Sequence, residues 1–190
     1  MGVGEIAYIA LLVVVGAERL VELAISQSHH RKMAQSGVQR MPERHFGAMV
    51  FLHTGVLIAA GAEVIFLHRR LIPALGYPML ALFVAANLIR LWVILTMRDH
   101  WTTRVMNSVN VGVVTSGPYR WVRHPNYSAV FLELIALPLI YTAWITATAA
   151  TAMNLWVLHE RLAVEDPVLL SNPTYRSLMG NKPRFLPRLL

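Results

Sequence analysis

Long apolar stretches alternate with short polar segments along most of the chain. Three of these stretches, at about residues 6–25, 46–67 and 71–97, are long enough to cross a hydrocarbon layer about 30 Å thick as helices. The pattern therefore predicts three transmembrane helices within residues 1–98.

A few polar side chains interrupt the predicted spans. They are Glu18, Arg19, Glu22, His53, Glu63, Asn87 and Arg90. A charged group inside a membrane is costly unless it is paired, and such groups often mark functional sites. Glu18 and Glu22 share a helical face, so we expect them either to pair with Arg90 between helices or to contribute with it to an acceptor pocket.

The fourth apolar region, residues 128–159, has two interpretations. Its 32 residues are too few for two full spans of about 20 residues and too many for one ordinary span. One interpretation is a tight hairpin of two short helices. The other is a single long helix kinked at Pro138, near the middle of the region. The two interpretations place the C-terminus on opposite sides of the membrane.

Basic residues in short loops predict the orientation, because they concentrate on the cytoplasmic side. Most of them lie in segments 26–45 and 98–127: Arg31, Lys32, Arg40, Arg44, Arg98, Arg104, Arg120 and Arg123. Arg69 and Arg70, between the second and third spans, oppose this orientation but are outnumbered. The pattern predicts an outside N-terminus. With the hairpin, the basic tail also becomes cytoplasmic, and this agreement favours the hairpin.

Composition supports a multi-pass protein of the cell membrane. Hydrophobic residues make up 56% of the 190 residues and charged residues only 14%, against about 25% charged in ordinary soluble domains. The net charge of +7 fits cytoplasmic loops and anionic lipid headgroups better than nucleic acid. The expected fold is all-α, a single domain (residues 1–190) forming a polytopic transmembrane bundle of about five helices, whose last two form the short hairpin. Residues 99–190 add a polar motif and a cytoplasmic C-terminal region.

The segment 117–127, Gly-Pro-Tyr-Arg-Trp-Val-Arg-His-Pro-Asn-Tyr, is basic, aromatic and stiffened by prolines. Pro125 suits the first turn of the following helix, where its missing N–H has no cost. Arg123 and His124 then lie at the start of that helix, whose N-terminus attracts anions, and Tyr127 lies one turn in. The alternative is a basic and aromatic anchor at the membrane interface.

A second charged cluster follows the predicted hairpin, at residues 159–166. Arg161 and Glu165 are four residues apart and share a helical face. They form a surface ion pair or, because a hairpin returns them to the side of Arg123 and His124, they line one cytoplasmic cavity with those residues. The sequence contains no glycine-rich nucleotide-binding loop and no H-E-x-x-H motif, so neither a Rossmann unit nor a metal site is predicted.

These motifs resemble the isoprenylcysteine carboxyl methyltransferase family. The resemblance covers about the last 90 residues and rests on V-V-T-S-G-P-Y at 113–119, R-H-P-N-Y at 123–127, R-x-x-x-E-D at 161–166, Tyr175, and R-F-L-P at 184–187. In the first 100 residues, E-R at 18–19, E-L at 22–23, H-F at 45–46 and L-H at 52–53 look like a bacterial branch that methylates alkylpyrones and related phenolic lipids.

The resemblance implies an integral membrane O-methyltransferase that uses S-adenosylmethionine, with its cofactor-binding region in the cytoplasmic C-terminal part. The residues expected to contact the cofactor are Val113, Val114, Tyr119, His124, Pro125, Asn126, Tyr127 and Glu165. Arg161 is expected to orient the acceptor oxygen, and Arg123 to bind the cofactor's carboxylate together with His124. Asp166 stands where the family often has a second glutamate, which leaves its role open.

The expected acceptor is lipophilic and reaches the site from the bilayer. It carries either a hydroxyl of the alkylpyrone or alkylresorcinol type or a carboxylate of the prenylcysteine type. His53 and Arg90 are candidates for the acceptor pocket, and His53 is the best candidate proton acceptor for a phenol.

Two other readings of the motifs remain. Some NADPH-dependent reductases of sterol- or polyprenol-like lipids carry a similar R-H-P-x-Y element. They combine it with R-x-x-R-D-D and a downstream cysteine, whereas this chain has R-x-x-x-E-D and no cysteine. A non-catalytic scaffold does not explain why so many polar groups gather together. The sequence does not predict an oligomeric state.

Overall fold

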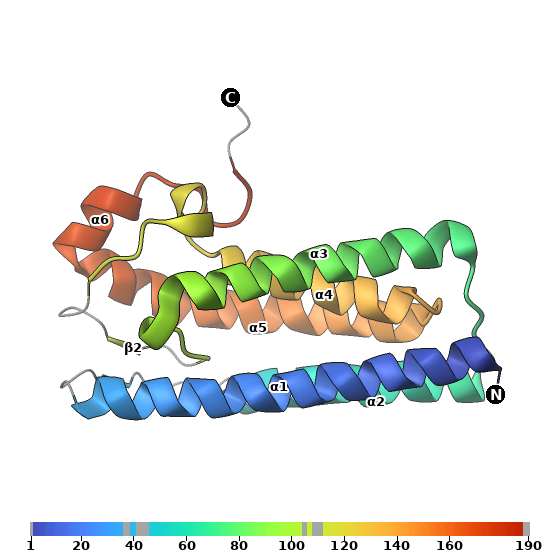
Figure 1. Cartoon of the computed structure of the whole chain (residues 1–190). Coiled ribbons are helices and arrows are strands. Elements are labelled where there is room, and N and C mark those ends of the chain that lie inside the picture. Colours follow the sequence, from blue (N-terminus) through green and yellow to red (C-terminus); the bar gives the residue numbers. More distant parts are fainter. Residues whose placement is uncertain (1, 36–38, 41–45, 104–105, 108–111, 188–190) are drawn as a thin grey trace.

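The computed structural model describes residues 2–35, 39–40, 46–103, 106–107 and 112–187. Its long helices lie side by side in one bundle (Figure 1). They are α1 (Val3–Gln35), α2 (Phe46–Phe66), α3 (Pro73–Met97), α4 (Pro125–Leu139) and α5 (Trp144–Ser171). The shorter elements are the strands β1 (Gln39–Arg40) and β2 (Met106–Asn107), which pair antiparallel, the 3₁₀ turns η1 (Arg98–His100) and η2 (Gly117–Arg120), and α6 (Pro173–Met179).

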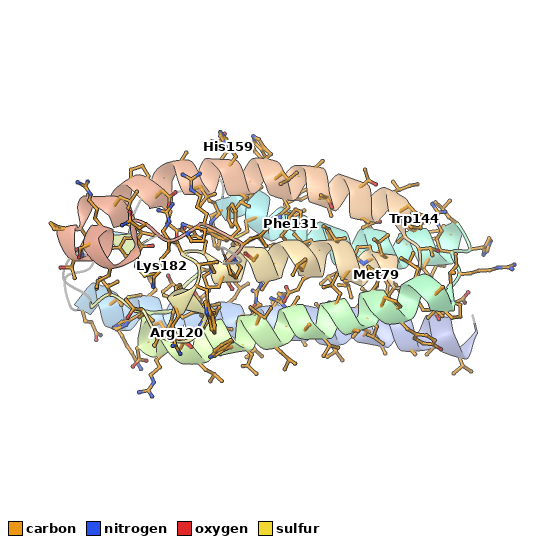
Figure 2. All side chains as sticks on the ribbon, turned by 90° about the horizontal axis from the view of Figure 1, so that it is seen from above. Met79, Arg120, Phe131, Trp144, His159 and Lys182 are labelled. Atoms are coloured by element: carbon orange, nitrogen blue, oxygen red, sulfur yellow. The ribbon has the colours of Figure 1, made fainter. Side chains whose placement is uncertain are left out.

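The short elements gather at one end of the bundle, and the N-terminus lies at the other (Figure 1). The side-chain view places Lys182 and Arg120 toward the end that carries α6, opposite Trp144 (Figure 2). Apolar side chains near the N-terminal end form the main core, which includes Tyr8, Val64 and Leu137. The end near the N-terminus is therefore filled by apolar side chains, and the opposite end carries the short segments with more polar residues.

The outer faces of α2 and α3 are apolar and exposed. Both helices are long and apolar enough to cross a membrane, whereas α4 is apolar but shorter. Ile58, Leu88 and Leu95 are large hydrophobic side chains that project from these outer faces. Apolar helix surfaces that face outward are typical of a membrane environment. The observed bounds agree with the second and third predicted spans to within about two residues.

The hairpin prediction is confirmed, but its second arm is longer than expected. The chain turns back between Leu139 and Trp144, and the hydroxyl of Thr142 in this turn donates to the carbonyl of Arg70 at 2.9 Å. Pro138 lies inside the last turn of α4 and does not kink one continuous helix. Helix α5 continues for 28 residues, so the predicted charged cluster lies on the hairpin itself.

The first helix is also longer than predicted. Residues from Ser26 onward were expected to form a loop, but α1 continues to Gln35. Contacts with a distant segment stabilise this extension: the Ser26 hydroxyl accepts from the Thr103 N–H at 2.9 Å, and His29 Nδ1 lies 2.8 Å from the Trp101 carbonyl oxygen. The side chains of three basic residues used to predict orientation, Arg40, Arg44 and Arg104, lie outside the described part, as does Arg188 of the basic tail.

The charged groups inside the predicted spans pair with one another. Arg90 donates to Glu22 (Nε to Oε1, 2.6 Å) and lies 3.4 Å from Glu133 of α4. Arg19 also contacts Glu22 at 2.8 Å, so the cluster joins three helices. The expected pairing of Glu22 with Arg90 is confirmed, whereas Glu18 contacts Arg19 instead.

Glu63 of α2 stabilises the N-terminus of α5, which has no side-chain cap of its own. Its carboxylate accepts from the N–H and hydroxyl of Thr146, both at 2.8 Å, and from the N–H of Ile145 at 3.2 Å. The first N–H groups of a helix have no partner within the helix, and an anion also offsets the helix dipole. Glu63→Ala is therefore expected to lower the free energy of unfolding by about 1–3 kcal/mol.

Thermal unfolding in detergent measures this effect as a lower melting temperature. Glu5→Ala is the matched control, because Glu5 lies at an exposed helix start and accepts one N–H bond, from Gly2. Equal melting temperatures for the two variants would contradict the capping role of Glu63.

Candidate functional site

One cavity of about 510 Å³ extends from the polar end of the molecule into the bundle. Its polar part is lined by η1, the segment 112–114, η2, the start of α4, the end of α5 and the start of α6. Its inner part lies among α1, α2, α3 and α5, where Gly16, Leu20, Val50, His53 and Arg90 contribute to the wall. The volume lies within the range of small-molecule sites.

The segment 117–127 is shaped by glycine and proline. Gly117 has a φ of +56°, and a Cβ added there would lie 2.5 Å from the hydroxyl oxygen of Thr96, so only glycine fits. Pro125 is the first residue of α4 and His124 is its N-cap, as predicted. These constraints direct Arg123 and His124 toward the end of α5.

Tyr127, Glu165 and Arg161 form a connected group on the cavity wall. The Tyr127 hydroxyl donates to the Glu165 carboxylate and accepts from Arg161 Nε at 3.1 Å. The Arg161 guanidinium also lies over the Tyr127 ring, 5.4 Å from its centroid, and donates to the Thr103 carbonyl at 3.1 Å. The shared helical face of Arg161 and Glu165 therefore brings both side chains to one tyrosine of α4.

His124 lies between two carboxylates of α5. Its Nε2 is 2.9 Å from Asp166 Oδ1, and its Nδ1 is 3.6 Å from Glu165 Oε1. Asp166 is only 4% exposed, and it is not among the residues that line the cavity. Asp166, whose role the sequence left open, thus lies behind the cavity wall. There it contacts His124, which lines the cavity.

The end of α5 carries charges from Glu160 onward and lies beyond the apolar part of the bundle. Burial alone disfavours the charge of Asp166 there. The hydrogen bond from His124 and the positive charges of His124, Arg123 and Arg184 outweigh burial and hold the pKa of Asp166 below its ordinary value. The ionised form is therefore the one that the folded protein stabilises.

This shift predicts a pH dependence that Asp166→Asn removes. The depressed pKa stabilises the folded protein fully above the unfolded pKa, about 3.9, and this contribution is lost as pH falls through the folded pKa. The difference in melting temperature between wild type and variant is expected to be constant from pH 7 to about 5 and to shrink below about pH 4. A difference that grows on acidification would contradict this assignment.

The cavity brings together nearly all predicted site residues. Those that line it are Val113, Val114, Tyr119, Arg123, His124, Asn126, Tyr127, Arg161, Glu165, His53 and Arg90. Pro125 is buried at the start of α4 and is not among the lining residues, so its observed role is to begin the helix. Contact of these residues with a cofactor stays a prediction.

Asn172 and Tyr175 are among the lining residues that were not predicted as site residues. Asn172 caps α6, because its Oδ1 accepts from the N–H groups of Thr174 and Tyr175 at 2.9 and 3.2 Å. This cap places Tyr175 on the cavity wall, where burial raises the pKa of the tyrosine to about 12, so its hydroxyl stays protonated at neutral pH. The N-P-x-Y pattern at 172–175 is a recognisable helix start that signals this position.

Known proteins resemble this chain in sequence and in fold. A sequence model of the isoprenylcysteine carboxyl methyltransferase family matches residues 79–171, which include α4, α5 and every predicted site residue except His53. Just under half of the chain therefore resembles this family. The match begins earlier than the predicted last 90 residues and ends before the C-terminal tail. It gives no support to the reductase alternative.

Two known proteins are similar to this chain. The uncharacterized protein YpbQ of Bacillus subtilis (strain 168) is 28% identical over 162 residues, covering 85% of this chain and 94% of YpbQ. The eukaryotic intramembrane Ras methyltransferase, an isoprenylcysteine carboxyl methyltransferase of known structure, has a TM-score of 0.53 at 23% identity. That similarity covers 72% of this chain and 52% of the methyltransferase, so this chain spans about half of its length. The likeness shows a shared fold.

Proposed function

We propose that this protein is a membrane-embedded, S-adenosylmethionine-dependent O-methyltransferase that acts on a lipophilic acceptor. The observation that carries the proposal is a single cavity with two different parts. Arg123, His124 and Glu165 line its polar part, and apolar side chains of α1 and α2 line the inner part. Such a cavity suits a charged methyl donor at one end and a lipid-like acceptor at the other.

The polar part has chemistry that fits the donor. Arg123 is nine-tenths buried, and its Nε and Nη1 donors have no hydrogen-bond partner among the described residues, although Nη1 lies 3.5 Å from Asp166. Asn126 Oδ1 is likewise buried without a partner. Buried donors and acceptors without partners are costly. The carboxylate of S-adenosylmethionine suits Arg123, while its ammonium and hydroxyl groups suit Asn126 and Glu165.

Bound S-adenosylmethionine supplies a methyl group on a positively charged sulfur. The protein's task is then to hold the acceptor oxygen in line with that group, which by itself lowers the barrier substantially. Arg161 lies where the polar and inner parts meet and contacts Tyr127 and the Thr103 carbonyl. We assign it the orientation of an anionic acceptor oxygen.

The inner part suits an acceptor with an apolar tail. Leu20 of α1 and Val50 of α2 both line the cavity, and their side chains are also 69% and 37% exposed. The cavity wall therefore reaches the outer surface between α1 and α2, at the level of the predicted spans. This geometry favours access from the bilayer. We infer the outside N-terminus and the cytoplasmic polar end from the basic residues of the loops.

His53 favours a hydroxyl acceptor of the alkylpyrone or alkylresorcinol type over a prenylcysteine-type carboxylate. Its Nδ1 lies 2.8 Å from the Met49 carbonyl, which only accepts, so the neutral ring carries its lone pair on Nε2. A hydroxyl must lose a proton on methylation, whereas a carboxylate has none to lose. His53→Gln is expected to lower turnover of a hydroxyl acceptor about 10- to 50-fold and to leave a carboxylate acceptor unchanged.

Labelled methyl transfer to an alkylpyrone, an alkylresorcinol and a prenylcysteine measures both the acceptor preference and the His53 effect. Equal loss with all three acceptors would contradict a proton-accepting role for His53. The proposed activity itself is tested by isothermal titration of the purified wild type with S-adenosylmethionine and with NADPH. Binding of NADPH without binding of S-adenosylmethionine would overturn the proposal.

A further inference from the structure

The last described residues of the chain, 180–187, run across the start of α4; we call this segment the C-terminal strap. Its backbone carbonyls accept from the motif: the Arg123 N–H donates to Pro183 and the His124 N–H to Arg184, both at 2.9 Å. The Ser128 hydroxyl donates to the Phe185 carbonyl at 3.0 Å. The strap therefore supplies partners for backbone groups at a helix start that would otherwise lack them.

Side chains of the strap also contact the motif. Lys182 donates to the Tyr119 carbonyl at 2.8 Å, and the Phe185 ring lies 6.4 Å from the His124 ring. Arg184 reaches α5, where its Nε and Nη2 both lie 2.8 Å from Asp166 Oδ2. The strap thus connects the start of α4 with the end of α5.

Asp166 is the point where these three segments meet. One oxygen, Oδ1, faces His124 and Arg123 of the motif, and the other, Oδ2, faces Arg184 of the strap. The carboxylate is buried and lies outside the cavity lining, whereas His124 and Arg123 lie on the lining. Asp166 is thereby suited to hold two cavity residues in place without touching a ligand itself.

We propose that Asp166 and Arg184 form a positioning pair through which the C-terminal strap fixes Arg123 and His124 in the geometry that binds the methyl donor. The proposal rests on the proposed function of the cavity. The bond from His124 Nε2 to Asp166 also sets which ring nitrogen faces the cavity, because Nδ1 is left on the side of Glu165.

The relative importance of the two residues follows from their burial. Arg184 is about half exposed (53%), and exposed ion pairs contribute little by themselves. Asp166 is buried against His124 and Arg123, so its loss leaves the buried Arg123 guanidinium and the His124 ring without their partner. The larger effect is therefore expected at Asp166, and Arg184 acts only through it.

The test measures the affinity for S-adenosylmethionine of purified full-length variants by isothermal titration. Asp166→Asn is expected to raise Kd about 10- to 30-fold and Arg184→Gln about fivefold, with Arg184→Lys recovering most of the loss. The double variant is expected to match Asp166→Asn alone. With a methyl acceptor, KM for S-adenosylmethionine rises while kcat stays within about twofold.

Arg176→Gln is the matched control, because Arg176 is an exposed arginine of neighbouring α6 whose Nε donates to the Leu170 carbonyl. Melting temperatures identify variants that lose affinity because they unfold. Affinities are compared only among variants that remain folded. Wild-type affinity in Asp166→Asn and Arg184→Gln, or additive effects in the double variant, would overturn the positioning pair. Failure of the wild type to bind S-adenosylmethionine would instead overturn the proposed function.

Discussion

Glu165→Gln is expected to raise the Kd for S-adenosylmethionine at least about 30-fold. The substitution keeps the size of the side chain but removes the charge that accepts from Tyr127 and faces His124. Truncating one partner of a buried charged interaction costs about 2–5 kcal/mol, and 1.4 kcal/mol corresponds to tenfold in affinity. The donor's ammonium or hydroxyl groups would also lose their anionic partner.

Isothermal titration of the purified variant measures this effect. Glu160→Gln is the matched control, because Glu160 lies on the same helix but not on the cavity wall. Unchanged affinity in Glu165→Gln alongside unchanged affinity in Glu160→Gln would show that this carboxylate does not hold the donor.

Arg161→Gln is expected to lower kcat about 100- to 1,000-fold while raising the Kd for S-adenosylmethionine no more than about fivefold. Arg161 lies between the polar and inner parts of the cavity, so it acts on the acceptor oxygen more than on the donor. Removing a group that positions or stabilises reacting charge typically costs this much in rate. Arg161→Lys keeps the charge but loses the planar fork that contacts Tyr127 and Thr103, so we expect partial activity.

Single-turnover transfer of a labelled methyl group separates the chemical step from donor binding. A variant that loses donor affinity and rate in the same proportion would place Arg161 in the donor site instead. Normal turnover in Arg161→Gln would exclude any contact with the acceptor oxygen in the reaction.

The membrane spans of α2 and α3 could be predicted closely because their apolar runs are long and have clear ends. The second begins just after a polar segment, and the third begins at Pro73, a residue suited to a helix start. The extension of α1 to Gln35 could not be predicted in this way. Polar residues after Ser26 have the pattern of a loop, and contacts with residues 101–103 hold them in a helix.

In the candidate site too, features set by local sequence could be predicted, and features set by contacts between distant segments could not. The sequence placed Arg161 and Glu165 on one face and Pro125 at the start of α4, since both inferences depend on local spacing. It did not reveal that Tyr127 joins the two charged residues, because that contact depends on how α4 and α5 pack. The location of Asp166 behind the cavity wall could not be predicted from the sequence either, because it depends on contacts with the strap.

The backbone bonds between the strap and α4 have a consequence for the order of synthesis. A chain emerges N-terminus first, and its parts can begin to fold as they appear. The N–H groups of Arg123 and His124 find their partners at Pro183 and Arg184, which are made after all of α4 and α5. A chain interrupted after α5 would retain its apolar helices for insertion but lack those carbonyl partners at the start of α4. Synthesis of the strap would thus be a condition for an ordered start of α4, and chains interrupted before it would carry the apolar helices with an incomplete site.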